Sequence, residues 1–445
     1  MMQPRPSIFG GSWWNDDNAG SRQANVDNWA DNSNENLGAR GRSDDCNDRL
    51  SMPVFAGGDM TRRRSRSRRS TTSIDQGRWS ARLSCFGEYT SRSGIAGRSA
   101  SSGASRPAAG SLFGSIMGKR YRNLIGRITA PETLRVAYRL TSQGKRLTAG
   151  FLNFKEYDAL NLADLARDMA RGDYTASAPH EFYILDPKRR LISALSFRDR
   201  VAQQALCLVI GPILDRALLP HCYACRKGKG THAGVVAVQS DLRRLARRGA
   251  VHVLKTDFSR YFASIERHTL WRMIEAKISC RATLRLIEAM VPRDGIGLPI
   301  GSLTSQIFAN LYAGATLDRH LQQTLGEDYW YRYMDDLVVL GHDAEHLRAV
   351  KRSIEAFSRD RLGLRFSKWS IQPAARGINF LGYRIWPTHK LLRRDSVTRA
   401  RRKIAAYRAG GDDGRLGKFL GAWLGHARWA DSANLIRSLG IEVAR

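Results

Sequence analysis

The stretch "YWYRYMDDLVVLGHD" at residues 329–343 decides the fold. Two short runs of β-prone residues flank the pair Asp335 and Asp336, which is the pattern of a β-hairpin with acids at its tip. Two adjacent carboxylates repel each other, and partial burial increases the repulsion unless a cation or solvent meets them. A pair of aspartates at a turn is by itself most often an ordinary turn, so the neighbouring motifs decide its role.

A third acid follows an earlier strand. The segment "VHVLKTDFS" at residues 251–259 reads as a buried strand that carries Asp257 near its end. If a sheet places this strand beside the hairpin, Asp257 lies opposite Asp335 and Asp336. Three carboxylates so arranged can hold two Mg²⁺ ions about 3.5–4 Å apart, which activate a 3′-hydroxyl and stabilise a pentavalent phosphorus and its leaving pyrophosphate. The pattern therefore predicts phosphoryl transfer.

Composition indicates a globular protein that binds a polyanion. The chain has 445 residues, 42% of them hydrophobic, and a formal net charge of +31, most of which falls after residue 110. Such a charge is typical of a nucleic-acid-binding surface, with a membrane-surface or ribosome-associated protein as the alternative. No apolar run approaches the roughly 18 residues of a membrane span, and no apolar signal region follows the first basic residue, so we expect a cytoplasmic protein without a membrane partner.

The cysteines do not predict a disulfide framework or a metal site. Six cysteines are scattered along the chain, as in a reduced compartment. Cys222 and Cys225, next to His221, have the spacing of zinc ligands, but no second pair follows, and we do not expect zinc.

The motifs together resemble those of reverse transcriptases. "YMDD" (333–336) is similar to their motif C, "LKTDFSRYFASI" (254–265) to motif A and "FLGYRI" (380–385) to the primer-grip hairpin, with 78 residues from Asp257 to Asp335. Within that superfamily the chain most resembles the enzymes of diversity-generating retroelements, from about Lys119 to its C-terminus. Group II intron and retron enzymes usually have Gln-Gly where this chain has Ile300-Gly301. Three stretches carry this resemblance: "FYILDPKRRLISALSFRDRVAQQAL" (182–206), "YACRKGKGTHAGV" (223–235) and "GLPIGSLTSQIFANLYA" (297–313).

The resemblance implies an α+β right-hand polymerase of fingers, palm and thumb. Its palm is expected to be a small antiparallel sheet with helices on one face. Residues 111–385 would form the fingers and palm, and residues 386–445 the thumb. Two thumb helices are expected, a basic one at 396–408 and an apolar one at 419–440, which would hold a duplex by its minor groove. His426, in the second, is expected to be packed and hydrogen-bonded instead of acting as a base.

Site residues follow from the same resemblance. Asp257, Asp335 and the backbone carbonyl of Phe258 would bind Mg²⁺, with Asp336 beside them. Lys368 falls where polymerases keep a lysine that can protonate pyrophosphate, although a solvated or template-contacting lysine is the alternative. Phe262 matches the aromatic gate that excludes a ribose 2′-hydroxyl, with a core phenylalanine as the alternative. Residues expected to contact the incoming nucleotide are Arg226, Lys227, Lys229, Phe258, Phe262, Ile300, Gly301, Ser305 and Gln306.

The N-terminal region has a different composition. Residues 1–50 are rich in asparagine, with eight of the fourteen asparagines of the chain in the first 47 residues, and residues 51–110 resemble a disordered Arg/Ser/Gly-rich linker. Both asparagine codons begin with two adenines, and residues 10–42 resemble the variable segment of the lectin-like proteins that these retroelements diversify. We interpret residues 1–50 as a translated template repeat without a fold of its own. A functional N-terminal domain is the alternative.

The expected activity is RNA-templated DNA synthesis from dNTPs, copying a template-repeat RNA with errors at adenines. Expected partners are the template RNA, the primer or cDNA, dNTPs and a small basic accessory protein. One alternative is a retron or group II intron-type reverse transcriptase of ordinary fidelity. Another is a non-catalytic RNA-binding protein on a polymerase scaffold, which the presence of all three aspartates disfavours.

Overall fold

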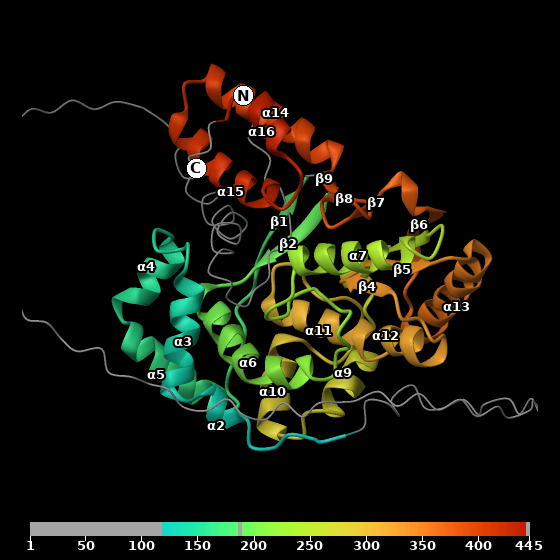
Figure 1. Cartoon of the computed structure of the whole chain (residues 1–445). Helices are drawn as coiled ribbons and strands as arrows, with labels where there is room; N and C mark the ends of the chain where they lie inside the picture. The colour runs from blue at the N-terminus through green and yellow to red at the C-terminus, as the bar shows by residue number, and fades with distance from the viewer. Residues whose placement is uncertain (1–117, 186–188, 442–445) are drawn as a thin grey trace, which may run out of the picture. The chain divides into compact units, whose positions relative to one another are not determined.

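The computed structural model describes residues 118–185 and 189–441 (Figure 1). The segments 1–50 and 51–110 lie outside these residues. Within the described part the chain combines helices with three sheets whose strand pairs are all antiparallel, so the expected α+β class with antiparallel sheets is confirmed. No helix in this part of the chain is long and apolar enough to cross a membrane.

The first described part is helical and carries one hairpin. In the helix α5 (Asp158–Arg171), Leu165 and Met169 are buried. Gly172 ends it in the left-handed conformation, with φ +89°, which glycine adopts without a steric penalty. The elements are α2 (Ile125–Ile128), α3 (Pro131–Ser142), α4 (Ala149–Glu156), α5 (Asp158–Arg171), β1 (His180–Ile184), β2 (Arg190–Ala194), α6 (Phe197–Asp215) and α7 (Thr231–Ala246).

The central sheet has the strand order β4-β5-β3-β6. Its strands are β3 (His252–Phe258), β4 (Trp330–Tyr333), β5 (Asp336–Gly341) and β6 (Phe366–Pro373). Because side chains alternate along a strand, Leu254 and Leu337 pack into one hydrophobic cluster, whereas Val253 and Val338 pack into another. The expectation of helices on one face only was wrong. The first cluster includes α11 (Leu303–Gly314) and α13 (Ala344–Leu362), and α7 covers the other face with its own buried valines and leucines.

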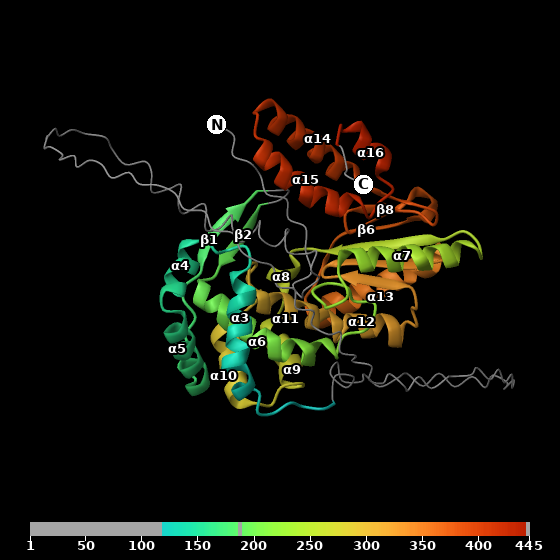
Figure 2. The same ribbon diagram turned by 60° about the vertical axis from the view of Figure 1, so that its left-hand side comes forward.

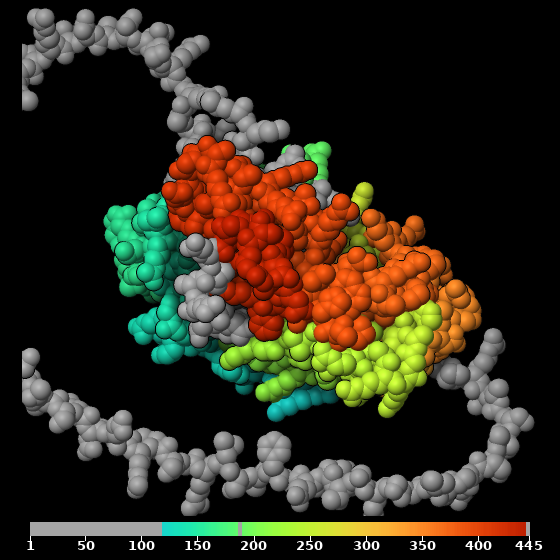
Figure 3. Space-filling view, turned by 45° about the horizontal axis from the view of Figure 1, so that its top comes forward, coloured from blue at the N-terminus to red at the C-terminus, as the bar shows by residue number. Residues whose placement is uncertain are grey.

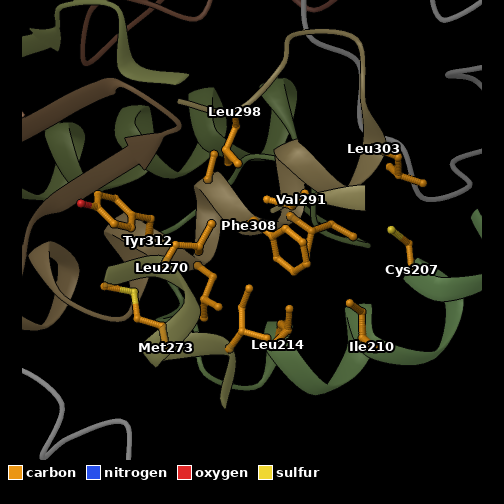
Figure 4. Close-up of a cluster of buried hydrophobic side chains, with 14 of the residues drawn as sticks. Cys207, Ile210, Leu214, Leu270, Met273, Val291, Leu298, Leu303, Phe308 and Tyr312 are labelled. Atoms are coloured by element: carbon orange, nitrogen blue, oxygen red, sulfur yellow. The ribbon is translucent and has the colours of Figure 1, made fainter. Parts of the chain in front are cut away.

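The larger cluster joins the sheet to helices from distant parts of the chain (Figure 4). Leu214 of α6 and Phe308 of α11 lie close to Leu270 and Met273 of the helix α9 in this view. Further elements are α8 (Tyr261–Ser264), α9 (Arg267–Glu275), α10 (Arg281–Met290), α12 (Leu317–Arg319), the π-helix η1 (His320–Thr324) and the 3-10 helix η2 (Ala374–Arg376). The helices of this cluster pack against the face of the sheet that carries Leu254 and Leu337.

A third sheet contains the predicted primer-grip hairpin. Its strands are β7 (Ile378–Phe380), β8 (Tyr383–Ile385) and β9 (Lys390–Leu392). The two residues between β7 and β8 are Leu381, with φ +48°, and Gly382, with φ +89°. Positive φ at both central residues is the geometry of the tight turns that join antiparallel strands, so the predicted hairpin is confirmed.

The C-terminal helices α14 (Arg394–Ala409), α15 (Asp413–Ala427) and α16 (Ala433–Ser438) pack together beyond the third sheet (Figure 2). The expected basic helix at 396–408 is confirmed as part of α14, but a single helix over 419–440 was wrong. The chain leaves the helical path after Ala427, because Asp431 exchanges hydrogen bonds with the backbone of Lys390 in β9, at 2.8 and 3.0 Å. This break ties the C-terminal helices to the third sheet.

The same helices also contact α7, as the red and yellow-green surfaces in Figure 3 show. Here the His232 ring stacks on Trp429, with 4.2 Å between ring centroids. His426 is buried and its Nδ1 lies 2.8 Å from the Tyr383 hydroxyl, as expected for a packed histidine.

Candidate active site

The fold brings the three predicted aspartates to one edge of the central sheet. β3 lies directly beside β5, and Asp257 faces Asp336 in the register of the two strands. Asp335 lies at the turn between β4 and β5, and its carbonyl accepts a hydrogen bond from the Phe258 amide at 3.3 Å. The neighbouring Met334 has a φ of +54°, a conformation that β-hairpin turns use and that an unbranched side chain tolerates at a cost. The predicted hairpin with acids at its tip, opposite Asp257, is confirmed.

The electrostatics of this edge favour a bound cation. Burial, followed by the charges of Asp257 and Asp336, raises the pKa of Asp335 to about 7, against the lowering effect of Arg190. Burial also raises the pKa of Asp336, and Lys255 opposes this shift. Each shift shows that a negative charge here is costly without a positive neighbour.

Asp336 already has such a neighbour. The ammonium of Lys255 lies 3.0 and 3.1 Å from its two carboxylate oxygens and donates to the carbonyl of Asn379 at 2.6 Å. Lys255 thus joins the acidic edge to β7 of the predicted primer-grip hairpin. In the described part of the chain, no lysine or arginine forms a comparable ion pair with Asp257 or Asp335.

The donors at this edge are the side chains that would have to hold Mg²⁺. No group of three or more His, Cys, Asp or Glu side chains in the described part of the chain is already arranged to hold a metal ion. Two carboxylates that repel each other remain as donors: Asp257, which precedes Phe258 at the end of β3, and Asp335, at the turn between β4 and β5. Hard oxygen donors with excess negative charge suit Mg²⁺, so the residues fit the ion.

A bulge in the edge strand β6 holds Asp257 in place. The pairing of β3 with β6 shifts between Asp257 and Phe258, so that Ser367 is an extra residue between Lys368 and Phe366. The Ser367 hydroxyl donates to the Asp257 carboxylate at 2.8 Å and lies 3.1 Å from its carbonyl oxygen. Bulges commonly re-aim side chains next to active sites. Lys368 is exposed and is the register partner of Asp257.

The loop 297–302 forms a second wall near this edge. Gly297 and Leu298 donate backbone hydrogen bonds to the carbonyls of Ile265, at 2.7 Å, and Phe262, at 2.8 Å. Phe262 is half-buried and contacts the Tyr261 ring edge-on, with 5.9 Å between centroids, so part of its ring remains accessible. A side chain in this position can act as a gate, which a fully buried phenylalanine could not.

The same loop reaches β2. Ile300 accepts a hydrogen bond from the Ser193 amide at 2.9 Å, and its side chain remains 36% exposed. Gly301 has φ +117°, and a Cβ there would lie only 2.7 Å from the Ser193 carbonyl oxygen, so glycine is needed for the contact. β2 also carries Arg190, whose charge acts on Asp335. The loop that carries Ile300 is therefore hydrogen-bonded to the strand whose Arg190 acts on Asp335.

In the segment 223–229, two of the three basic side chains bind other groups of the protein. Arg226 is paired with Asp215 at 2.6 Å and donates to the carbonyl of Leu219 at 2.6 Å. Lys229 donates to the Pro220 carbonyl at 2.7 Å, and burial, followed by the charge of Arg226, lowers its pKa. Lys227 is exposed. Nucleotide contacts by these three residues stay a prediction.

The neighbouring α11 presents polar groups towards the same segment. Gln306 is partly buried, and its Oε1 accepts from the Cys225 thiol at 3.1 Å, whereas Ser305 is wholly buried. The Cys222 thiol donates to Asn310 at 2.9 Å. Both thiols of the zinc-like motif are hydrogen-bonded to α11.

Three residues of the site were missed from the sequence: Arg190, Lys255 and Ser367. Lys255 could have been found, because it stands two residues before Asp257 and so shares its face of the strand. A lysine in an otherwise apolar buried strand needs a partner. Ser367 depends on a bulge, and Arg190 on a contact between distant segments, neither of which local sequence shows.

Residues 185–385 match the protein family described as reverse transcriptase (RNA-dependent DNA polymerase). A curated relative, protein YkfC of Escherichia coli strain K12, is 22% identical over 60% of this chain and 83% of its own length.

Among solved structures, apo telomerase from Candida tropicalis is 11% identical, with a TM-score of 0.40 over 56% of this chain and 54% of that one. The same telomerase truncated from its C-terminal domain is also 11% identical, with a TM-score of 0.37 over 53% of this chain and 60% of that one. The chain thus spans little more than half the length of these telomerases.

Proposed function

We propose that the chain is an RNA-directed DNA polymerase, with residues 185–385 as its reverse transcriptase domain, that copies a template-repeat RNA into cDNA with errors at adenines. Such cDNA would diversify a target gene. The juxtaposition of Asp257 and Asp335 at the end of β3 carries the catalytic part of the proposal. In domain terms, residues 111–385 would be fingers and palm, and residues 386–445 the thumb.

Asp257, Asp335 and the Phe258 carbonyl would hold two Mg²⁺ ions, which supply Lewis-acid activation of the primer 3′-hydroxyl and charge stabilisation of the phosphoryl group. Ser367 orients the Asp257 carboxylate at 2.8 Å, and Lys255 neutralises Asp336 and fixes it to the primer-grip hairpin. The chain itself thus positions the reacting groups. Lys368, the exposed register partner of Asp257, would give a proton to the pyrophosphate.

Nucleotide selection would depend on the wall formed by the loop 297–302. Phe262 would exclude ribonucleotides by filling the space beside the sugar. Ile300, apolar and 36% exposed, offers packing without a directional hydrogen bond. A correct base pair would gain less over a mispaired one, and a loss of about 1.4 kcal/mol in that difference lowers discrimination about tenfold. Ile300 alone would lower fidelity at every base, so a preference for errors at template adenine needs a second cause. That cause would be a contact from Arg226 or the weaker A·T pair.

The test is sequencing of cDNA made by the full-length enzyme on one RNA template of balanced composition. The proposal predicts errors concentrated opposite adenine. Ile300→Gln should reduce misincorporation opposite adenine by roughly tenfold while extension continues. Leu391→Gln is a matched control, because Leu391 is a similarly exposed aliphatic side chain, 40% exposed, on β9 instead of the loop. Equal error spectra in wild type and Ile300→Gln would remove Ile300 from the mechanism.

A reverse transcriptase of ordinary fidelity is the second candidate. It is favoured if wild-type cDNA is accurate at adenine, which would remove the retroelement proposal. The DNA that encodes residues 1–50 gives an independent check, because a near-repeat of this DNA that differs at adenines would identify the template. The small basic accessory protein that the retroelement reading implies is tested by extension with and without neighbouring gene products.

A further inference from the structure

A buried ion pair lies directly behind the acidic edge and is not accounted for by nucleotide binding or metal binding. Arg332, three residues before Asp335, and Asp318 of α12 are both wholly buried. The guanidinium meets the carboxylate with two hydrogen bonds, from Nε at 2.6 Å and from Nη2 at 2.8 Å. This two-point geometry fixes the plane of the guanidinium, which a single bond would leave free to turn.

The rest of the guanidinium is directed at the catalytic turn. Its Nη1 donates to the carbonyl of Met334 at 3.1 Å, the residue with φ +54° that precedes Asp335. A residue in this conformation persists when its surroundings hold it there. The hydrogen bond acts on the peptide that links Met334 to Asp335, so it bears directly on where the Asp335 carboxylate lies.

The same side chain reaches two other segments of the site. Its Nη2 lies 3.1 Å from the Cys222 sulfur and 3.4 Å from the carbonyl of Asn310 in α11. The Asn310 amide in turn donates to the carbonyl of Ala224 at 2.8 Å. We call Arg332, Asp318, Asn310 and Cys222 the Arg332 network. It connects the catalytic turn to α11 and to the segment that leads into Arg226.

A glycine on α11, Gly314, leaves room for the Arg332 guanidinium. A Cβ at Gly314 would lie 3.3 Å from the Arg332 Nη2 and 2.3 Å from a Leu218 methyl group, so a larger residue would crowd the guanidinium. The Arg332 main chain also pairs with the neighbouring segment, donating to the His221 carbonyl at 3.0 Å and accepting from the Tyr223 amide at 2.9 Å. The side chain and the main chain of Arg332 therefore both bind the segment 221–223.

We propose that Arg332 is a positioning residue of the polymerase reaction, whose buried guanidinium holds the Met334 carbonyl and so sets the place of Asp335. A buried ion pair is not needed for stability as such, because an apolar pair of similar volume can replace it. What an apolar pair cannot replace is the donor to the Met334 carbonyl. A displacement of the catalytic group by about 1 Å lowers the rate by roughly 100-fold.

The test is the double variant Arg332→Met/Asp318→Leu in the full-length chain. It removes both buried charges together and leaves no unpaired charge behind. The readout is single-nucleotide extension of a DNA primer on an RNA template, with kcat and KM for the dNTP measured separately. We expect kcat to fall about 100-fold, while KM and the Kd for template-primer change less than about threefold. A merely structural role would lower the folded fraction and leave the kcat of the folded enzyme unchanged.

Two matched controls accompany this variant. Cys222→Ala removes a network member but keeps the bond to Met334, and kcat should stay near that of the wild type. Arg293→Met removes a partly exposed guanidinium, paired with Glu275 at 2.7 Å, in a different part of the fold, and should also leave kcat unchanged.

A folded double variant with kcat within threefold of the wild type would overturn the proposal. If the double variant does not fold, Arg332→Lys decides, because lysine keeps the charge beside Asp318 but not the planar fork that also reaches Met334. Its kcat should fall at least tenfold, and an unchanged kcat would equally overturn the proposal. The inference rests on the polymerase activity, but failure of the wild type to extend any primer would count against that activity and not against Arg332.

Discussion

Replacing Asp335 by Asn should stabilise the protein in the absence of divalent ions, by an amount that grows with pH. Burial and the nearby Asp257 raise the pKa of Asp335 to about 7 in the folded chain, from an ordinary value of 3.8. The folded state therefore binds the proton more tightly than the unfolded state. The stability that this gives is fully present below pH 4 and is lost as the pH rises towards 7.

The size of the stability difference follows from the gap between the two pKa values of Asp335. Each pH unit between the two pKa values costs about 1.36 kcal/mol, so the wild type should lose about 2–3 kcal/mol between pH 5 and pH 8 relative to Asp335→Asn. Asparagine carries no charge at either pH and keeps nearly the same volume. Mg²⁺ should cancel the difference at pH 8, because a ligand that binds only the folded state at 100 times its Kd adds about 2.7 kcal/mol.

The assay is urea unfolding of both proteins at pH 5 and pH 8, in EDTA and then with Mg²⁺. Asp164→Asn, a substitution of an exposed aspartate on α5, is the control and should show no such pH dependence. A wild type that is as stable as Asp335→Asn at pH 8 in EDTA would refute the crowding of negative charge at the turn. A difference that Mg²⁺ does not reduce would instead refute the assignment of this edge to a cation.

Three further predictions concern other parts of the site. Phe262→Val should open space beside the sugar, and ribonucleotide incorporation, measured with mixed dNTP and NTP pools, should rise; unchanged incorporation would make Phe262 a packing residue only. Ser367→Ala removes the 2.8 Å hydrogen bond to Asp257 and should lower kcat about tenfold with template binding unchanged, whereas an unaltered kcat would show that the bulge alone orients the carboxylate. Deletion of residues 1–110 should leave primer extension intact, and a folded but inactive product would assign the N-terminal region a function.

Local pattern was sufficient for the acidic edge because its parts have strong periodic signals. Alternation around "VHVLKTDFS" and the paired β-prone runs around Asp335 predicted strands that the fold places next to each other. In each case one stretch of sequence contains the whole signal.

What could not be predicted depends on contacts between distant segments. The break between α15 and α16 arises from hydrogen bonds of Asp431 to Lys390, and no helix-breaking residue precedes it at Arg428 or Trp429. The second covered face of the sheet needs α7 to pack across it, which the alternation of Val253 with Leu254 permits without specifying. The partners of Lys255 and Arg332 lie in other elements. Local sequence contains the charge but not its counterion.

The most direct test of the central claim is extension of a DNA primer on an RNA template by the full-length wild type and by Asp335→Asn in parallel. The account predicts Mg²⁺-dependent extension by the wild type, and a fall of several orders of magnitude in the variant with RNA binding preserved, because one negative ligand of the metal pair is lost at constant volume. A variant that keeps more than about a tenth of the wild-type extension rate would contradict the assignment of Asp335 to catalysis.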